Sequence, residues 1–159
     1  MSKKTMKPEA GELLFAYESA APKERIIKLI NDGADLEERD EETNATILIL
    51  ACRDGDTWLV PLLIEKGADL DAKDKDESTA LMYASWNGFT EVVRLLIEKG
   101  ADLHLKDAAG NDALDAARSD GRNQAAAVIE REEEILQRIS DSSIRKPLVV
   151  KPIIKFGDL

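Results

Sequence analysis

The sequence predicts an all-α solenoid, a stack of repeated helix pairs that ends in a longer C-terminal helix. Two observations carry this prediction. The nine residues LLIEKGADL occur at 62–70 and again, unchanged, at 95–103, and a weaker copy, KLINDGADL, occupies 28–36. The chain is also 43% hydrophobic but only 4% aromatic, so Ala, Leu, Ile and Val must build its core. Small side chains suit closely packed helices, and a period near 33 residues is typical of stacked repeats.

The expected units follow in order along the chain. Residues 1–9 are an N-terminal tail and 10–140 the repeat domain, with units of about 11–40, 41–74, 75–107 and 108–140. In the first unit, LLFAYESA provides the first helix. Ala20 stands there in place of the glycine that separates the two helices of later units.

The second and third units show the pattern most clearly. ILILACR and ALMYASW are short helices that stop at Gly55 and Gly88, because glycine readily adopts the left-handed conformation beyond a helix end. The second helix, clearest in EVVRLLIEKG, ends at Gly100, and a polar GADLxxKD segment then turns toward the next unit. Pro61 must lie in the first turn of its helix, where a missing N–H is tolerated.

The last unit begins with GNDALDAARSDG and continues into RNQAAAVIEREEEILQRIS, a longer helix with apolar residues at helical spacing. A polar outer face on this cap helix is what a solenoid needs to end without exposing its core. Residues 141–159 form a tail, whose stretch 144–159 carries a charge of about +3 and in which Pro147 and Pro152 favour an extended conformation.

These residues resemble the ankyrin-repeat family over about 10–140. The 33-residue period, Thr-x-Leu-x-x-Ala, the glycine between helices and LLIEKGADL match that family's pattern. The usual Thr-Pro-Leu-His reads Thr46-Ile-Leu-Ile49 and Thr79-Ala-Leu-Met82 here. The contacts of the family's histidine are therefore lost or replaced, and we expect Ile49 and Met82 to supply apolar contacts instead.

Composition narrows the classes of partner and compartment. A formal net charge of −10 disfavours binding to nucleic acid or to an anionic membrane, and it is compatible with a protein partner that has a basic surface. We expect a cytoplasmic location, because no signal-like or membrane-spanning apolar run occurs and Cys52 is a single cysteine. We also expect a monomer. A secreted effector is the alternative.

Catalytic, cofactor and metal signals are not found in the sequence. His104 is expected in a solvated turn rather than at a catalytic or metal site, and Cys52 in the core rather than as a reactive thiol. The acidic runs DEET, DKDE and EREEE lack the calcium-loop pattern. An enzyme or metal-dependent module is thus the contrasting class, and no cofactor is expected.

The resemblance implies non-catalytic protein binding through hairpin tips and the exposed side of the first helices. The expected role is that of an inhibitor, an immunity protein or an adaptor, or of a secreted bacterial effector that acts on a host protein. The hairpin positions are Glu42, Thr43, Ala45, Lys75, Asp76, Ser78, Ala108, Ala109 and Asn111, and the helix positions are Glu18, Ser19, Arg53, Asp54, Trp86, Asn87, Ser119 and Asp120.

Three aromatic residues and the apolar tail have competing interpretations. Trp86 is either an exposed anchor for a partner or a side chain folded over the neighbouring repeat. Trp58 is expected to pack against the first repeat or near Pro22 rather than to bind a partner. Tyr83 is expected in the core. The tail either packs on its own solenoid, donates a strand to a partner or covers the recognition face. Its candidate contact residues are Leu148, Val150, Ile153, Ile154 and Phe156.

Overall fold

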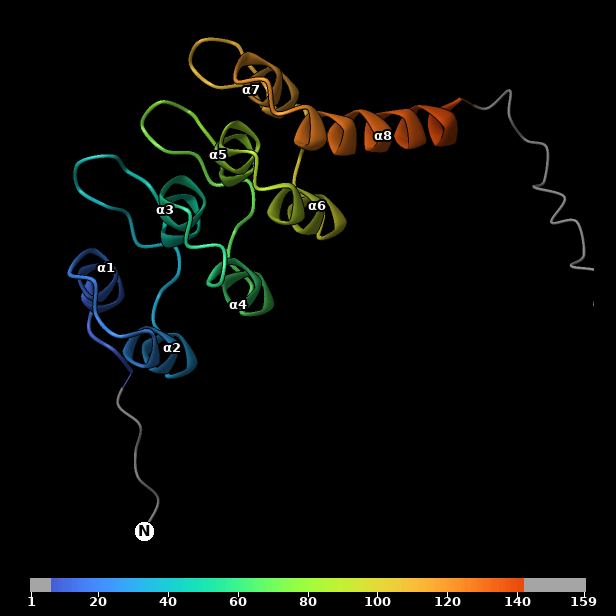
Figure 1. Ribbon diagram of the computed structural model, residues 1–159. Helices are drawn as coiled ribbons and strands as arrows, with labels where there is room; N and C mark the ends of the chain where they lie inside the picture. Colours follow the sequence, from blue (N-terminus) through green and yellow to red (C-terminus); the bar gives the residue numbers. More distant parts are fainter. Residues whose placement is uncertain (1–6, 142–159) are drawn as a thin grey trace, which may run out of the picture.

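The computed structural model describes residues 7–141, which form eight helices and no strand within that range. The helices are α1 (Glu12–Glu18), α2 (Lys23–Asn31), α3 (Ile47–Asp54), α4 (Val60–Glu65), α5 (Ala80–Asn87), α6 (Thr90–Glu98), α7 (Ala113–Ser119) and α8 (Asn123–Ser140). In Figure 1, α1, α3, α5 and α7 line up in one layer and α2, α4 and α6 in a second, with the loops projecting beyond the first layer. The predicted all-α solenoid is confirmed.

The core is built from the same positions of successive units. Helix α5 packs between α3 and α7. The alanine that ends Thr-x-Leu-x-x-Ala, or Asp-x-Leu-x-x-Ala in the last unit, is fully buried at Ala51, Ala84 and Ala117. An alanine at this position lets neighbouring helices approach closely. In the second layer, Leu63 and Leu96, from the two copies of LLIEKGADL, are also fully buried. The repeated sequence therefore supplies core residues that hold the stacked units together.

The helices begin and end at the residues predicted from the sequence. Gly55 and Gly88 adopt left-handed backbone angles, with φ of 88° and 75°, and Ala20 does so with φ of 53°. Pro61 is the second residue of α4, within the first turn as expected. At the start of α5, the Thr79 hydroxyl accepts the Met82 N–H, and the Met82 sulfur accepts the Thr79 N–H, each at 3.4 Å. Met82 therefore supplies a polar contact in addition to the expected apolar one.

Three hairpin turns, residues 40–45, 74–78 and 107–111, connect the units. Each closes through a hydrogen bond from the N–H of its first residue to the carbonyl of its last, at 2.9–3.1 Å. The first turn is one residue longer than the others, which accounts for the spacing of 34 rather than 33 between Gly33 and Gly67. Neighbouring turns are joined by Lys75 N–H to Thr43 carbonyl and Ala108 N–H to Asp76 carbonyl, both 2.9 Å.

Helix α8 closes the stack with its first half only. Ala125, Ala126 and Ile129 are buried, and α8 packs on α6 and α7, whereas its second half runs beyond them in Figure 1. Ile135 and Ile139 are 40% and 76% exposed. The expectation that a polar face alone would meet solvent is therefore wrong for this half, because α8 is longer than the layer it covers. No helix among residues 7–141 has the length and apolar character needed to cross a bilayer.

Candidate partner-binding surface

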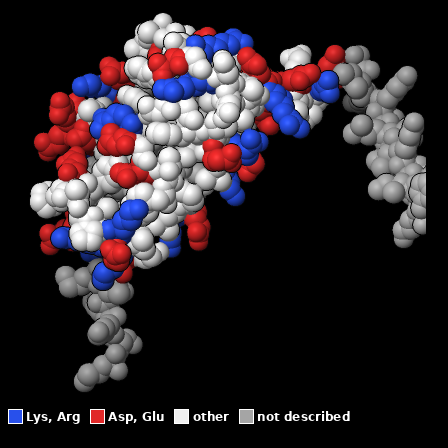
Figure 2. All heavy atoms as spheres, viewed as in Figure 1, with Lys and Arg blue, Asp and Glu red and all other residues white. Residues whose placement is uncertain are grey.

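The three hairpin turns and the outward sides of α1, α3, α5 and α7 adjoin one another (Figure 1). We term this surface the hairpin face. Hydrogen bonds between neighbouring turns and packing between neighbouring first helices hold it together. In Figure 2, Asp and Glu side chains gather along the edge where the hairpin turns lie. The face is therefore an ordered surface with a predominantly negative edge.

On the part of the hairpin face from α3 to α7, Trp86 is the most exposed large apolar side chain. Its exposed fraction is 55%, in keeping with the interpretation of a solvent-facing residue rather than one folded over its neighbour. The equivalent residues of the adjoining units are Arg53 and Ser119. The Trp86 carbonyl accepts a hydrogen bond from Arg122 Nε at 3.2 Å, which fixes the end of α5 while leaving the indole outside.

Other predicted contact residues of the first helices have internal partners. The Asn87 amide donates to the carbonyls of Cys52 and Arg53, each at 3.1 Å, and so ties α5 to the end of α3. Arg53 pairs with Asp54 at 2.9 Å, and Asp120 pairs with Arg122 at 2.6 Å. Asn87 thus holds two neighbouring units together, whereas the two ion pairs are exposed on the surface.

Predicted contact residues of the hairpin turns also divide into two groups. Glu42, Lys75 and Asp76 are exposed, whereas the N–H and hydroxyl of Thr43 both donate to the carboxylate of Asp40. Those two hydrogen bonds lower the pKa of Asp40. Ala45, expected at a hairpin tip, is fully buried. That expectation is wrong, because Ala45 is the last residue of its turn, directly before the N-cap Thr46 of α3, where the chain has returned to the core.

The side chains of the first turn meet those of α1 and α3 around a hollow of about 470 Å³, which we term the acidic hollow. Its lining brings together five of the predicted contact residues with four others: Tyr17, Glu18, Asp40, Glu42, Thr43, Leu50, Arg53, Asp54 and Asp56. Partial burial, reinforced by the neighbouring Asp40 and Glu41, raises the pKa of Glu18. Five carboxylates facing one guanidinium give this hollow a negative potential.

Tyr17 and Asp56 were not among the residues predicted from the sequence. The Tyr17 hydroxyl donates to Asp56 at 2.8 Å and lies 3.5 Å from a carboxylate oxygen of Asp54, which joins α1 to the second unit. Burial and the hydrogen bond to Asp56 raise the pKa of Tyr17. The sequence feature that points to this role of Tyr17 is its size, because the equivalent positions of the next two units hold the smaller Cys52 and Ser85.

The remaining candidates lie apart from the acidic hollow. Trp58 is half-buried against the core, and the ammonium of Lys23, the residue after Pro22, lies 4.6 Å from its ring centroid. The Tyr83 hydroxyl donates to Asp74 at 2.8 Å, and its ring packs on the core. Burial raises the pKa of Cys52 to about 12, so the thiol is protonated and unreactive at neutral pH.

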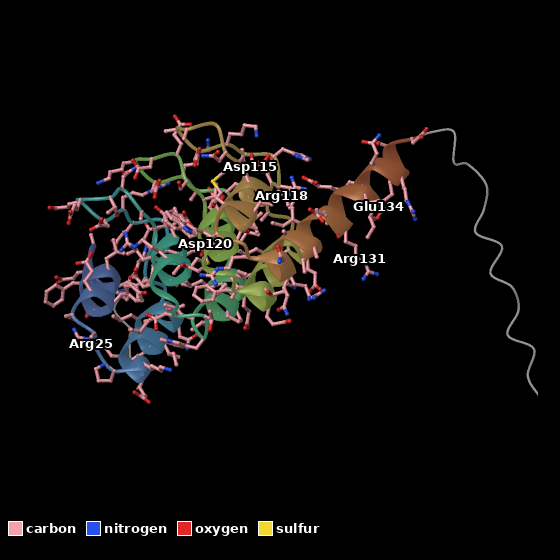
Figure 3. The ribbon with its side chains drawn as sticks, turned by 45° about the horizontal axis from the view of Figure 1, so that its top comes forward. Arg25, Asp115, Arg118, Asp120, Arg131 and Glu134 are labelled. Atoms are coloured by element: carbon pink, nitrogen blue, oxygen red, sulfur yellow. The ribbon has the colours of Figure 1, made fainter. Side chains whose placement is uncertain are left out.

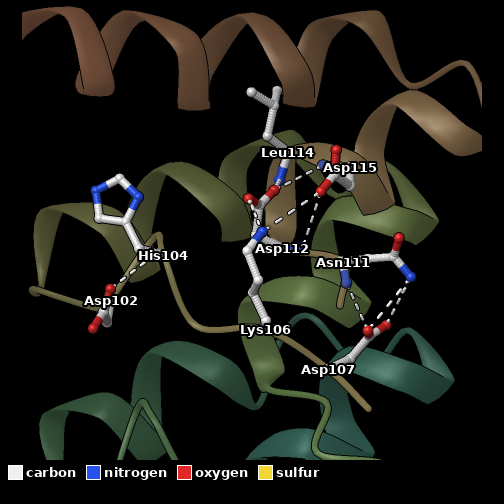
Figure 4. Close-up of polar contacts among 8 residues, drawn as sticks. All are labelled: Asp102, His104, Lys106, Asp107, Asn111, Asp112, Leu114 and Asp115. Atoms are coloured by element: carbon white, nitrogen blue, oxygen red, sulfur yellow. Dashed lines mark hydrogen bonds and ion pairs between the residues drawn. The ribbon is translucent and has the colours of Figure 1, made fainter. Parts of the chain in front are cut away.

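His104 lies exposed in a turn and donates its backbone N–H to Asp102 at 2.8 Å (Figure 4). Within residues 7–141, no group of three or more His, Cys, Asp or Glu side chains is placed to hold a metal ion. The tail candidates Leu148, Val150, Ile153, Ile154 and Phe156 lie outside the described residues.

Paired helices stacked in two layers, with linked hairpin turns along one edge, define a class of helical repeat scaffolds. The family model for ankyrin repeats, in three copies, matches residues 13–107. The chain therefore belongs to the ankyrin-repeat family, whose repeats generally mediate contacts between proteins and are typically non-catalytic. Comparison with curated proteins finds no match.

Proposed function

We propose that this protein is a non-catalytic binding module that holds a protein partner on its hairpin face, with Trp86 as the main anchor. The exposure of this indole is the observation that carries the proposal. A tryptophan that is 55% exposed on an ordered surface offers a large, rigid contact area, and such residues dominate many interfaces. The equivalent positions hold Arg53 and Ser119, so this row of residues distinguishes one repeat from the next.

The partner has a basic surface that faces the acidic hollow. Glu42, Arg53 and Asp54 contact it there, while Lys75, Asp76 and Ser78 contact it along the next turn and Ser119 and Asp120 at the far end. Complementary charge accelerates association and excludes acidic competitors. The protein acts as a cytoplasmic monomer, in the role of an inhibitor, an immunity protein or an adaptor.

Affinity capture from native lysate, read out by mass spectrometry, tests this function. Trp86→Ala should reduce recovery of the captured partner by at least about tenfold, the effect of losing a hot-spot side chain. The matched control is Ile27→Ala, which shortens an apolar side chain that is 36% exposed on α2, in the other layer. This control should capture the partner as well as the wild type does.

Thermal unfolding of both variants separates binding from stability. Trp86→Ala should leave the melting temperature nearly unchanged, because more than half of the side chain is exposed in the free protein. Equal capture by wild type and Trp86→Ala would contradict the role of the indole. A large fall in melting temperature would instead identify Trp86 as part of the core.

A further inference from the structure

The projecting half of α8 exposes an apolar surface that the described chain leaves uncovered. Val128, Ile135, Leu136 and Ile139 recur at helical spacing, and we term them the α8 stripe. Ile135, Leu136 and Ile139 are 40%, 45% and 76% exposed. Ile129 and Ala125 lie about two and three helical turns before Leu136, and both are buried where α8 packs on α6 and α7. The stripe thus continues a core face beyond the elements that cover it.

Two grooves run beside the α8 stripe. One, of about 550 Å³, lies between α6 and α8 and includes Val128 and Ile135 in its wall. The other, of about 830 Å³, lies on the opposite side and includes Leu136 and Ile139. An extended segment laid along the stripe would therefore meet apolar side chains at its centre and a recess on either side.

The borders of the stripe are acidic. Glu134 pairs with Arg138 at 3.1 Å, and Glu130 pairs with Arg118 at 2.7 Å. Glu132 and Glu133 have no ion pair among residues 7–141. Figure 3 shows Arg131 and Glu134 on the part of α8 that extends past the other helices. An occupant with apolar and basic residues would complement this surface.

We propose that residues 142–159 of this chain pack back along the α8 stripe. The segment has four basic residues against one acidic residue, and six apolar residues lie between positions 148 and 156: Leu148, Val149, Val150, Ile153, Ile154 and Phe156. It begins next to Asp141, immediately after α8. Eighteen extended residues reach roughly 60 Å, whereas α8 is about 27 Å long, so the segment can turn and follow the whole stripe.

Charge and connectivity favour this occupant over a second copy of the chain. Two α8 helices that paired through their stripes would bring Glu132 and Glu133 of both copies together, in a protein of formal net charge −10. The stripe is also short for a stable dimer, whose interface buries at least about 1,000 Å². The tail brings opposite charge, and its attachment to α8 gives it a high effective concentration.

Hydrogen exchange of the full chain tests the proposal independently of any partner. The six apolar residues between positions 148 and 156 are replaced by serine, which keeps the length and charge of the segment. Amides of Glu132–Ser140 should then exchange at least about tenfold faster, because the covering segment is lost. A control variant, Phe15→Ser, alters a side chain that is 65% exposed on α1 and should leave exchange in α8 unchanged.

A second variant keeps the test decisive if the serine replacement changes folding. Glu132→Lys with Glu133→Lys leaves every apolar residue in place and should also accelerate exchange in the second half of α8, since the basic tail is repelled. Unchanged exchange in both variants would overturn the proposal. Protection that rises with protein concentration, together with a dimeric mass in light scattering, would overturn it in favour of a second copy.

Discussion

Three equivalent aspartates, Asp40, Asp74 and Asp107, organise the hairpin turns. Each begins its turn, and each carboxylate accepts backbone N–H groups from residues two to four positions later. Asp107 receives the N–H group of Ala109 at 2.9 Å and that of Asn111 at 2.8 Å, and Figure 4 shows Asn111 beside the Asp107 carboxylate. This accounts for the aspartate that ends the polar stretch of every unit, because its side chain satisfies turn N–H groups that no strand pairs.

The hairpin turns should make stability depend on acid pH. Partial burial of Asp107 opposes its ionisation, but hydrogen bonds from Asn111, Ala109 and Gly110 outweigh it, and the net effect lowers the pKa. The unfolded carboxyl has a pKa of about 3.9 and binds protons first as pH falls, so acid favours the unfolded chain. The melting temperature should therefore fall from about pH 4 downward, through the folded-state pKa.

Asp107→Asn isolates this contribution. The amide keeps an oxygen that accepts the same N–H groups, but it has no charge to titrate. At pH 7 this variant should melt below the wild type, and the difference should shrink as the pH approaches 3, when measured by circular dichroism in matched buffers. A constant difference between pH 7 and pH 3 would contradict the assignment.

At the scale of the elements, the end of α1 shows how a non-glycine residue stops a helix. Ala20 has φ of 53°, and the Ala20 and Ala21 N–H groups donate to the carbonyls of Tyr17 and Ala16 at 3.0 and 2.9 Å. This pattern satisfies the last carbonyls of a helix, and glycine usually occupies the left-handed position. The alanine methyl group makes that conformation unfavourable by about 1–2 kcal/mol.

Ala20→Gly should consequently stabilise the protein. The relief of strain exceeds the extra freedom that glycine gives to the unfolded chain, so the free energy of unfolding should rise by about 0.5–1 kcal/mol in urea titrations. Gly100→Ala is the reciprocal control: its φ is 95°, and an added Cβ would meet nothing within 4 Å. It should lower stability by about 1 kcal/mol. A loss of stability in Ala20→Gly would contradict this account.

The elements inside the repeat were predictable, and those outside it were less so. The copies of LLIEKGADL, the glycines Gly55 and Gly88 and the alanine pattern fix helix pairs because every unit faces the same neighbours. The structural role of Asn87 was not predicted, because its amide donates hydrogen bonds to carbonyls 34 and 35 residues away in the sequence. The projection of α8 beyond α6 and α7 was not predicted either. Helical spacing shows which residues share a face, but it does not show where the helices that cover this face end.

The candidate site was predictable to a similar degree. Repeat register placed Trp86, Arg53 and Asp54 on one face, and the structure shows Trp86 exposed there. The acidic hollow needed three-dimensional information, because it joins Tyr17 of the first unit to Asp56 of the second. Pairwise contacts of that kind depend on side-chain reach, which the repeat pattern does not encode.

At the scale of the whole molecule, charge should govern the rate of partner binding. The formal net charge is −10, and the acidic hollow places several carboxylates on the hairpin face. If the captured partner is basic, the association rate constant should fall by about tenfold or more between low salt and several hundred millimolar salt, because ions screen the attraction. Surface plasmon resonance over a salt series measures this, and a salt-independent rate would contradict electrostatic steering.

The most direct measurement of the central claim is hydrogen exchange of the protein with and without its captured partner. If the hairpin face holds the partner, protection should appear in the turns 40–45, 74–78 and 107–111 and at the ends of α3, α5 and α7, with Trp86 at the centre. Helices α2, α4 and α6 should exchange as in the free protein. Protection confined to those three helices, with the hairpin turns unchanged, would contradict the account.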